Sequence, residues 1–291
     1  MSLRPGQPDT QPVKQQVASF GAGPFVTLRR FVQHGRLIVW NARQNRKGLM
    51  RAARNQEHAA LPAWQTAGYN RIVGALFAIG SLLFMLGASL SLVPGSLGLS
   101  SPQVGLVYFL GSIPFTMAAY MQHFQSANAP AFSVQQQPAA PPARIRLIGW
   151  QPRSAGWIST LAQFIGTVAF NVNTYDGIGT PANWYLQDTL VWAPDMIGSV
   201  LFLVSGYLAM LETSHAYWSW RPRELAWQIA FINLWGCIFF MTAAVLAYVP
   251  QRQEAAWIGV LANAHLWLGA FCFMVGGLLL MKESRQADQR S

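Results

Sequence analysis

Five polar or ionisable side chains stand inside otherwise apolar stretches of this sequence: Gln163, Asp195, Asn233, Asn263 and His265. Such groups are costly at membrane depth and are therefore candidates for function. Asp195 and His265 fall at a similar depth, about 10–14 Å from the outer surface at a rise of about 1.5 Å per residue. A pair of them, with Pro194 opening the helix beside it, could titrate during proton or cation movement. The competing interpretation is a static polar clamp between helices, or an Asp195 shallow enough to reach headgroup water.

The elements that hold these residues share one repeated pattern, an apolar residue, Gly and, four places later, Phe. It occurs six times, as Gly80 with Phe84, Gly111 with Phe115, Gly166 with Phe170, Gly198 with Phe202, Gly236 with Phe240 and Gly269 with Phe273. Positions four apart lie on one face of a helix, so each copy predicts a helix with a stripe of Gly and Phe. Three short intervals between glycines predict three hairpins. We interpret the stripes as packing seams, with the lining of a substrate path as the alternative.

Composition places these helices in a membrane. The 291 residues are 52% hydrophobic and only 10% charged, against about 25% charged in soluble domains. Six mostly apolar stretches can each cross a hydrocarbon core of about 30 Å: 70–93, 102–125, 155–173, 188–210, 225–248 and 256–281. The predicted fold class is therefore all-α, a polytopic membrane protein of six transmembrane helices arranged as three antiparallel hairpins.

The basic residues predict the orientation. Of the 20 Lys and Arg, all but Arg252 fall in segments on one side of the predicted spans, which places both termini in the cytoplasm of a multi-pass inner (plasma) membrane protein. The net charge of +10 is then explained by insertion and by anionic lipid headgroups, without a nucleic-acid partner. The first apolar span starts near residue 70, so no cleavable secretory signal is expected. Cys237 and Cys272 lie inside spans and are expected to be free thiols.

The chain before the first span divides in two. Residues 1–22 are rich in Pro and Gln and are expected to be a disordered tail. Residues 23–63 form a basic amphipathic cytoplasmic segment in which Arg29, Arg36 and Arg43 recur every seven residues. We expect a helix lying on the membrane surface with these arginines on anionic headgroups; an ordinary solvated segment is the alternative, and Gly35 interrupts the helical pattern.

The remaining boundaries follow the hairpins. We assign 64–125 to the first transmembrane hairpin, 126–154 to a cytoplasmic linker rich in Pro and Gln, 155–211 to the second hairpin, 212–283 to the third, and 284–291 to a cytoplasmic tail.

The motifs IGSLLF at 79–84 and LGSIPF at 110–115 resemble the YrhK-like family of small bacterial membrane proteins. IGSVLF at 197–202 is a close further copy, whereas IGTVAF, WGCIFF and LGAFCF are looser. Asn70 and Asp188 stand ten residues before their glycines, where that family has a polar residue. The resemblance covers most of 64–281 as three tandem hairpins. It implies a helical-hairpin fold, and it implies no established function and no catalytic residue.

No HExxH, GxSxG, phosphate-binding loop, CxxC pair or paired-carboxylate motif is present, so we expect no enzyme, no metal and no cofactor. A haem held by His123 and His215 has no other support. The leading hypothesis is a non-enzymatic scaffold or accessory protein that associates with itself or with another membrane protein through its Gly/Phe stripes. The alternative is a small proton- or cation-coupled transporter or channel that uses Asp195 and His265. Broken helices and a polar cavity would favour the alternative; a solid bundle would favour the scaffold.

Overall fold

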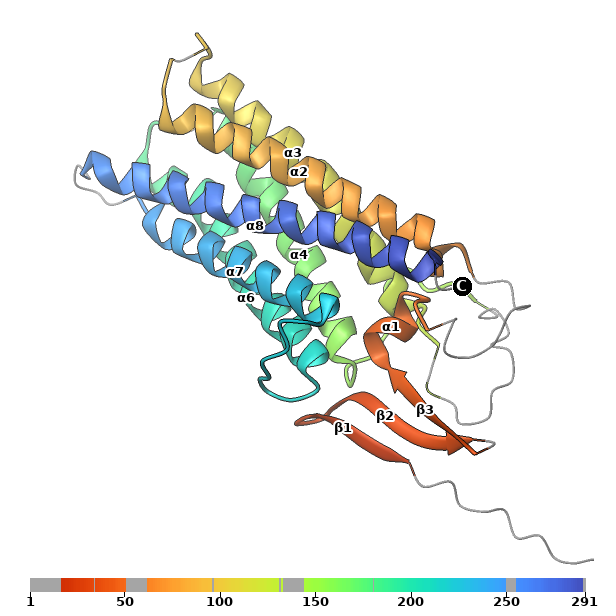
Figure 1. Cartoon of the computed structure of the whole chain (residues 1–291). Coiled ribbons are helices and arrows are strands. Elements are labelled where there is room, and N and C mark those ends of the chain that lie inside the picture. Colours follow the sequence, from red (N-terminus) through yellow and green to blue (C-terminus); the bar gives the residue numbers. More distant parts are fainter. Residues whose placement is uncertain are drawn as a thin grey trace, which may run out of the picture.

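The structure is a computed structural model that describes residues 17–33, 35–50, 62–95, 97–130, 132, 144–179, 181–249 and 255–289. It is mostly helical (Figure 1). Six long helices make up the body: α2 (Ala67–Leu92), α3 (Ser101–Ala127), α4 (Ala155–Asp176), α6 (Ala193–Ser214), α7 (Leu225–Leu246) and α8 (Ala256–Gln289).

Within the described residues, five helices are long and apolar enough to cross a membrane: α2, α3, α7, α8 and the continuous helical stretch Trp184–Ser214 that contains α6. This stretch begins with the short helix α5 (Trp184–Leu186) and a π-helical segment, Gln187–Trp192. Helix α4 is the exception. Its sequence, AGWISTLAQFIGTVAFNVNTYD, carries many Ser, Thr, Asn and Gln side chains, which lower its mean hydropathy.

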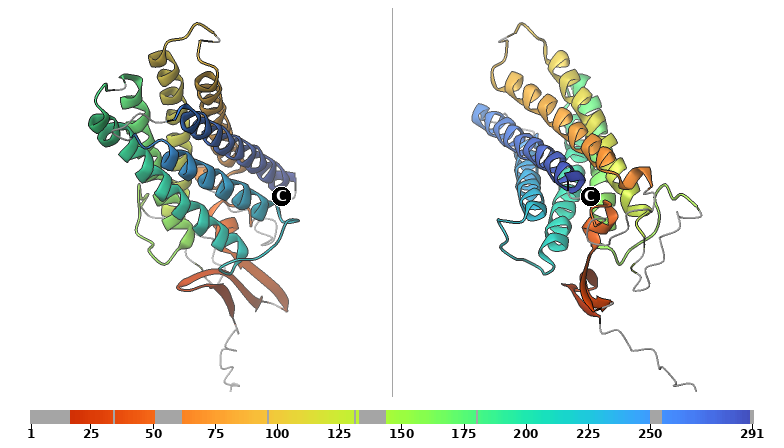
Figure 2. Two further views of the ribbon diagram at one scale, coloured as in Figure 1. Left: turned by 90° about the vertical axis from the view of Figure 1, so that its left-hand side faces the viewer. Right: turned by 45° about the vertical axis from the view of Figure 1, so that its right-hand side comes forward.

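The six helices form a closed ring. Each packs against the next one along the chain, and α8 packs against α2 to complete the circle. The views in Figure 2 show the helices side by side and inclined to one another, with the C-terminal end of α8 close to the N-terminal elements. A ring of this kind has an axis, and side chains from all six helices can meet on it.

The N-terminal segment is a β-sheet, which corrects both the predicted membrane-surface helix and the all-α class. Strands β1 (Ala18–Ala22), β2 (Phe25–Gln33) and β3 (Arg36–Asn41) pair antiparallel in the order β1-β2-β3. Gly23 (φ 53°) and Gly35 (φ 74°) lie between the strands in the left-handed region, which glycine adopts without steric cost in tight hairpin turns. The basic segment therefore folds back on itself instead of running as one helix.

The sheet also changes the expected domain boundaries. Residues 18–22 of the predicted disordered tail form β1, whereas residues 1–16 lie outside the described residues. Residues 131 and 133–143 of the predicted linker also lie outside the described residues.

The sheet sits below one end of the ring (Figure 1), and His215 ties it there. His215 caps the C-terminal end of α6 in the left-handed region (φ 54°). Its Nδ1 lies 3.0 Å from Thr27 Oγ1 on β2, and its Nε2 lies 3.2 Å from Asn41 Nδ2 at the end of β3. Because the Asn41 amide nitrogen can only donate, Nε2 accepts and the imidazole is neutral.

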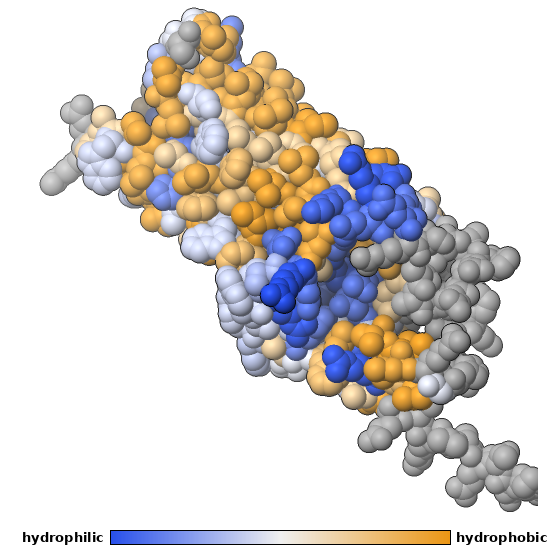
Figure 3. Space-filling view, in the orientation of Figure 1, coloured by the Kyte–Doolittle hydropathy of each residue, from blue (hydrophilic) through white to orange (hydrophobic). Residues whose placement is uncertain are grey.

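The two ends of the molecule differ in surface chemistry. Figure 3 shows apolar residues over most of the helical body and hydrophilic residues gathered toward the end that carries the sheet. We call this the proximal end, and the opposite end the distal end. An apolar belt bounded by a polar end is the surface expected of a protein embedded in lipid.

Candidate functional site

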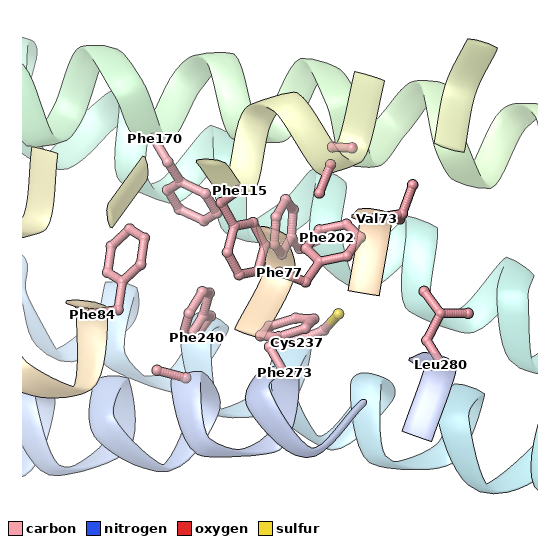
Figure 4. Packing of buried hydrophobic residues seen from close by; sticks show 13 residues of the cluster. Val73, Phe77, Phe84, Phe115, Phe170, Phe202, Cys237, Phe240, Phe273 and Leu280 are labelled. Atoms are coloured by element: carbon pink, nitrogen blue, oxygen red, sulfur yellow. The ribbon is translucent and has the colours of Figure 1, made fainter. Parts of the chain in front are cut away.

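The phenylalanines of the six stripes converge on the ring axis. All six are buried, with between 1% and 7% of their surface exposed, and Figure 4 shows their rings packed together between the helices. Ring centroids of contacting pairs lie 4.9–6.2 Å apart, the closest being Phe170 and Phe202. Most pairs meet edge to face or tilted, the arrangements that aromatic quadrupoles favour.

The stripe glycines bring the paired helices into close contact. A Cβ added to Gly80 would lie 2.8 Å from the carbonyl oxygen of Gly111, and one added to Gly166 would lie 3.1 Å from that of Gly198. Gly236 and Gly269 are related in the same way. Small residues thus allow backbone approach at mid-height of all three helix pairs.

Helix direction sorts the axial side chains into two layers. A residue four places after a glycine lies about 6 Å along the helix, and a residue three places before it lies about 4.5 Å the other way. Because neighbouring helices run in opposite directions, the Phe of one helix meets the position three before Gly of the next. Each side of the glycine level therefore receives one side chain from every helix.

On the distal side these six residues all line one cavity: Phe84, Tyr108, Phe170, Asp195, Phe240 and Leu266. We call this set the distal layer. Its aromatic members form a connected series, since Phe84 contacts Tyr108 and Phe240, and Phe240 contacts Phe170. Asp195 is the one charged residue among them.

The proximal layer is made in the same way from Phe77, Phe115, Gln163, Phe202, Asn233 and Phe273. Phe115, Phe202 and Phe273 form a complete triangle with centroid separations of 5.4–6.1 Å. All members of the proximal layer except Phe115 line a second cavity, on the proximal side. Thus the two layers stack into one aromatic seal between two cavities.

The distal cavity has a volume of about 630 Å³, within the range of about 300–1,000 Å³ typical of small-molecule sites. It is lined by residues of all six long helices and by the loop after α2, including Pro94 and Leu97. Its polar lining includes the Tyr108 hydroxyl, which donates to Asn263 Oδ1 at 3.1 Å, and Asn173, whose Nδ2 donates to the Val191 carbonyl at 2.9 Å.

The proximal cavity is smaller, about 80 Å³, and more polar. Besides Gln163 and Asn233 it is lined by Ser159, Ser205 and the natural thiol Cys237. At its end lies the short helix α1 (Ala42–Arg46), which follows β3 directly; this helix and its C-terminal cap Lys47 together contribute three basic side chains to the lining.

These basic groups form a buried ion cluster with two carboxylates of the ring. Arg46 makes a two-point contact with Glu212 of α6, at 2.7 Å and 3.0 Å. Arg43 pairs in the same two-point way with Glu283 of α8, which also accepts from Lys47 Nζ at 3.3 Å. Two-point guanidinium–carboxylate contacts fix geometry as well as charge. The cluster therefore holds α1 across the proximal end of the ring.

Burial changes the protonation of the cluster. For Arg43, burial alone would lower the pKa, but the Glu283 carboxylate raises it above the ordinary value. Burial, followed by repulsion from Arg43, lowers the pKa of the Lys47 ammonium to about 7 despite the attraction of Glu283. Lys47 is thus the group of α1 that changes charge near neutral pH.

Amide side chains fix the end of α1. Gln65 Nε2 donates to the carbonyls of Asn45 and Arg46, and Asn70 Nδ2 donates to that of Lys47 at 2.9 Å. Gln125 in turn donates to Asn70 Oδ1 at 3.0 Å. These are carbonyls that a helix end leaves unsatisfied, so α1 is held at both its side chains and its backbone.

The polar residues singled out from the sequence divide between the cavities. Gln163 and Asn233 line the proximal cavity, and Asp195 and Asn263 line the distal one. His265 lines neither: its Nδ1 lies 2.8 Å from the Leu261 carbonyl of its own helix, and its ring packs on Phe239. In the described part of the chain no hydrogen bond or ion pair joins Asp195 to His265.

The three arginines expected on lipid headgroups fall on three different elements. Arg29 lies on β2 with its guanidinium 4.2 Å from the Phe132 ring centroid, Arg36 lies on β3, and Arg43 is buried against Glu283. A spacing of seven aligns residues on one helix, and the described backbone of this segment is two strands and a short helix instead.

Several residues of the site were missed from the sequence. Gly74 and Gly277 bring α2 and α8 together, since a Cβ on either would lie 2.7 Å from the carbonyl oxygen of the other. Gly156 makes room for the Arg46–Glu212 pair; its Cβ would lie 2.6 Å from Glu212 Oε1. The available signal was a carboxylate at the end of an apolar span, which requires a partner when buried.

Among the described residues no group of three or more His, Cys, Asp or Glu could hold a metal ion. A scan against protein-family models and searches of curated proteins and of solved structures found no match to this chain. The resemblance to the YrhK-like family therefore stays a prediction, and function has to be argued from the site itself.

Proposed function

We propose that this protein is a membrane transporter or channel with a pathway along the axis of its helix ring. The observation that carries this proposal is the pair of cavities that meet opposite faces of one aromatic seal. Each cavity is lined by all six long helices. A short stack of rings on a shared axis is a hydrophobic constriction of the kind that gates pores by excluding water.

The alternative of a scaffold acting through its Gly/Phe stripes has less support. The stripe phenylalanines are buried against one another within one chain, and the glycines contact each other across helix pairs. Little of either is left on the outer surface for a partner. A polar cavity inside the bundle also argues against a solid packing module.

In this proposal all six helices span the membrane as three hairpins. Helix α4 counts as the sixth span because its polar side chains are used inside the ring: Ser159 Oγ donates to the Ser205 carbonyl, and Thr116 donates to Asn171 Oδ1 of α4. Polar residues that face a bundle interior are tolerated at membrane depth. The distribution of Lys and Arg supports a cytoplasmic location for the proximal end and both termini, with the distal cavity facing outside.

The proximal end then carries a cover. Helix α1, clamped by the Arg43–Glu283 and Arg46–Glu212 pairs, closes the cytoplasmic side, and the aromatic seal closes the middle. The π-helical segment Gln187–Trp192 leads directly into α6, and such segments occur often at functional sites. The state described is one in which both barriers are shut.

The test is thiol labelling from outside the cell with a small charged methanethiosulfonate reagent. A Cys272→Ala chain retains Cys237, which lines the proximal cavity. A second chain, with both natural cysteines replaced and Thr174→Cys added, reports on the distal cavity. We expect labelling at position 174 and none at Cys237, because the seal separates them.

Phe202→Ala removes the ring that contacts four others in the seal and is expected to make Cys237 reactive. The matched control is Phe271→Ala, on a residue that is 39% exposed and stacks on Trp267 of the same helix. The proposal fails if position 174 stays unreactive, or if Phe202→Ala leaves Cys237 no more accessible than Phe271→Ala does.

A further inference from the structure

The distal layer has an unusual composition for a membrane interior. Four of its six members are aromatic, one is Leu266, and the sixth is Asp195. The aromatic members line the cavity as a connected series of tilted rings, which we call the aromatic floor, with centroid separations of 5.8–6.2 Å between Tyr108, Phe84, Phe240 and Phe170 in that order. Aromatic faces carry negative quadrupole charge and attract cations, above all organic ammonium groups.

Asp195 stands at the edge of this floor without a partner. Within the described part of the chain it takes part in no hydrogen bond or ion pair, and no Lys, Arg or His lines the cavity. A carboxylate in a partly desolvated place normally requires a counter-charge. The ring does not provide one, so the missing charge is free to come from a ligand.

The remaining polar groups of the cavity point the same way. Asn173 uses its Nδ2 on the Val191 carbonyl, which leaves Oδ1 as an acceptor. Asn263 uses its Nδ2 on the Gly259 carbonyl, and the Tyr108 hydroxyl proton is given to Asn263 Oδ1. The Oδ1 atom of Asn173 and the second lone pair of Asn263 Oδ1 can therefore accept a hydrogen bond from a ligand.

We propose that the distal cavity binds an organic monocation, with its ammonium group at Asp195 and its apolar body against Phe84, Phe170 and Phe240. This proposal names the substrate class of the pathway. The binding of the cation is argued from the cavity alone, whereas its transport rests on the proposed function. A volume of about 630 Å³ accepts a small aromatic or alkyl ammonium ion.

An inorganic cation fits the same cavity poorly. A bare metal cation needs about six or more oxygen ligands in place of its water shell, whereas this cavity offers one carboxylate and a few amide and hydroxyl oxygens among largely apolar side chains. An ammonium ion with methyl or aryl groups is weakly hydrated and loses little on entering. The aromatic floor therefore selects for the organic ion over the inorganic one.

The experiment measures binding of benzyltrimethylammonium to the full-length chain in lipid nanodiscs by calorimetry, beside its neutral isostere neopentylbenzene. We expect the cation to bind at least tenfold more tightly than the isostere. Asp195→Asn should weaken cation binding about 10- to 100-fold, as loss of one charged partner does, whereas Asp195→Glu should retain most of it. The control is Asp176→Asn, which removes the same charge at the same end of the ring from a residue outside the cavity lining.

Equal binding of the isostere, or binding unchanged by Asp195→Asn, would overturn the proposal. A loss common to Asp195→Asn and Asp176→Asn would do the same, because it would assign the effect to overall charge. Uptake of the radiolabelled cation into proteoliposomes separates the two proposals. Binding without uptake would refute the pathway and keep the site, and uptake insensitive to Asp195→Asn would refute the site and keep the pathway.

Discussion

Replacing Glu212 by Gln should release α1 from the proximal end of the ring. The change keeps the size and shape of the side chain and removes its charge. Glu212 is 2% exposed and holds both terminal nitrogens of Arg46. A Gln at position 212 has one acceptor oxygen for the Arg46 guanidinium. Its amide NH2 group can only donate, so it would face the second guanidinium nitrogen, donor against donor.

The size of the effect follows from the balance of the cluster. Breaking a buried ion pair from one side costs about 3–5 kcal/mol, because the remaining charge is left uncompensated. Loss of Glu212 leaves Arg43, Arg46 and Lys47 against Glu283 alone. Loss of Arg46 leaves two basic groups against two carboxylates, so Arg46→Gln should cost less than Glu212→Gln.

Amide hydrogen exchange on peptides covering residues 41–50 provides the assay, since it records local opening as well as global unfolding. A cost of about 3–5 kcal/mol corresponds to exchange faster by on the order of 10²- to 10⁴-fold. The control is Glu224→Gln, which breaks the exposed pair with Arg221, whose side chains are 54% and 38% exposed; exposed pairs contribute about 0–1 kcal/mol.

The same reasoning predicts the exchange rate of a double variant. The double variant with Arg46→Gln and Glu212→Gln carries no uncompensated charge at this pair and should exchange more slowly than Glu212→Gln alone. If the two single variants cost the same, or if the double variant is worse than either, the cluster does not hold α1 by charge balance and the reasoning is refuted.

Two further predictions concern the sheet and the ring. Burial lowers the pKa of His215 to about 4 from 6.5, so the contact between His215 and the sheet is fully stable above about pH 6.5 and weakens as the pH falls toward 4. The loss is about 1–2 kcal/mol after allowing for partial exposure. Amide hydrogen exchange in β2 should show this pH dependence, and His215→Gln should abolish it. Gly277→Ala should lower the thermal stability of the chain in detergent, because the added Cβ would lie 2.7 Å from the Gly74 carbonyl oxygen. The control Gly259→Ala, on the same helix but with open space around it, should raise stability by up to about 1 kcal/mol. Equal effects of the two substitutions would contradict the packing described.

The features of the fold that the sequence could predict are those encoded within one helix. Apolar length and the recurrence of Gly and Phe four places apart are local properties, and the structure has a long helix at each of the six apolar stretches. The meeting of Gly80 with Gly111 follows from their equal depth in adjacent helices. None of this required knowledge of distant parts of the chain.

The sheet was missed because its sequence is ambiguous. Apolar residues of segment 25–41 recur at spacings that suit a helix or a strand, and short apolar runs cannot be assigned by periodicity alone. The decisive signal was the pair of glycines at 23 and 35, which permit tight turns. Read as turn residues, they divide the segment into strand-length pieces.

The ion cluster could not be predicted, because its partners are distant in sequence. Arg46 and Glu212 are 166 positions apart, and Arg43 and Glu283 are 240 apart. Without the fold, a basic residue beside a membrane is assigned to solvent or headgroups, as the arginines of α1 were. Only the closure of the ring places these carboxylates under α1.

Asp195 lies on the ring axis and His265 lies away from it because of the direction in which each side chain leaves its helix. The depth of a residue along the helix does not determine this direction. At about 100° per residue, a side chain three places before the stripe glycine lies about 60° to one side of it, and one four places before lies about 40° to the other. In α3, α6 and α8, which run in the same direction, the residues three places before Gly are Tyr108, Asp195 and Leu266, and all three line the distal cavity. His265, four places before, turns instead to Phe239 of the neighbouring helix. The axis therefore lies on the same side of every stripe, and this shared handedness assigns Asp195 to the cavity without His265.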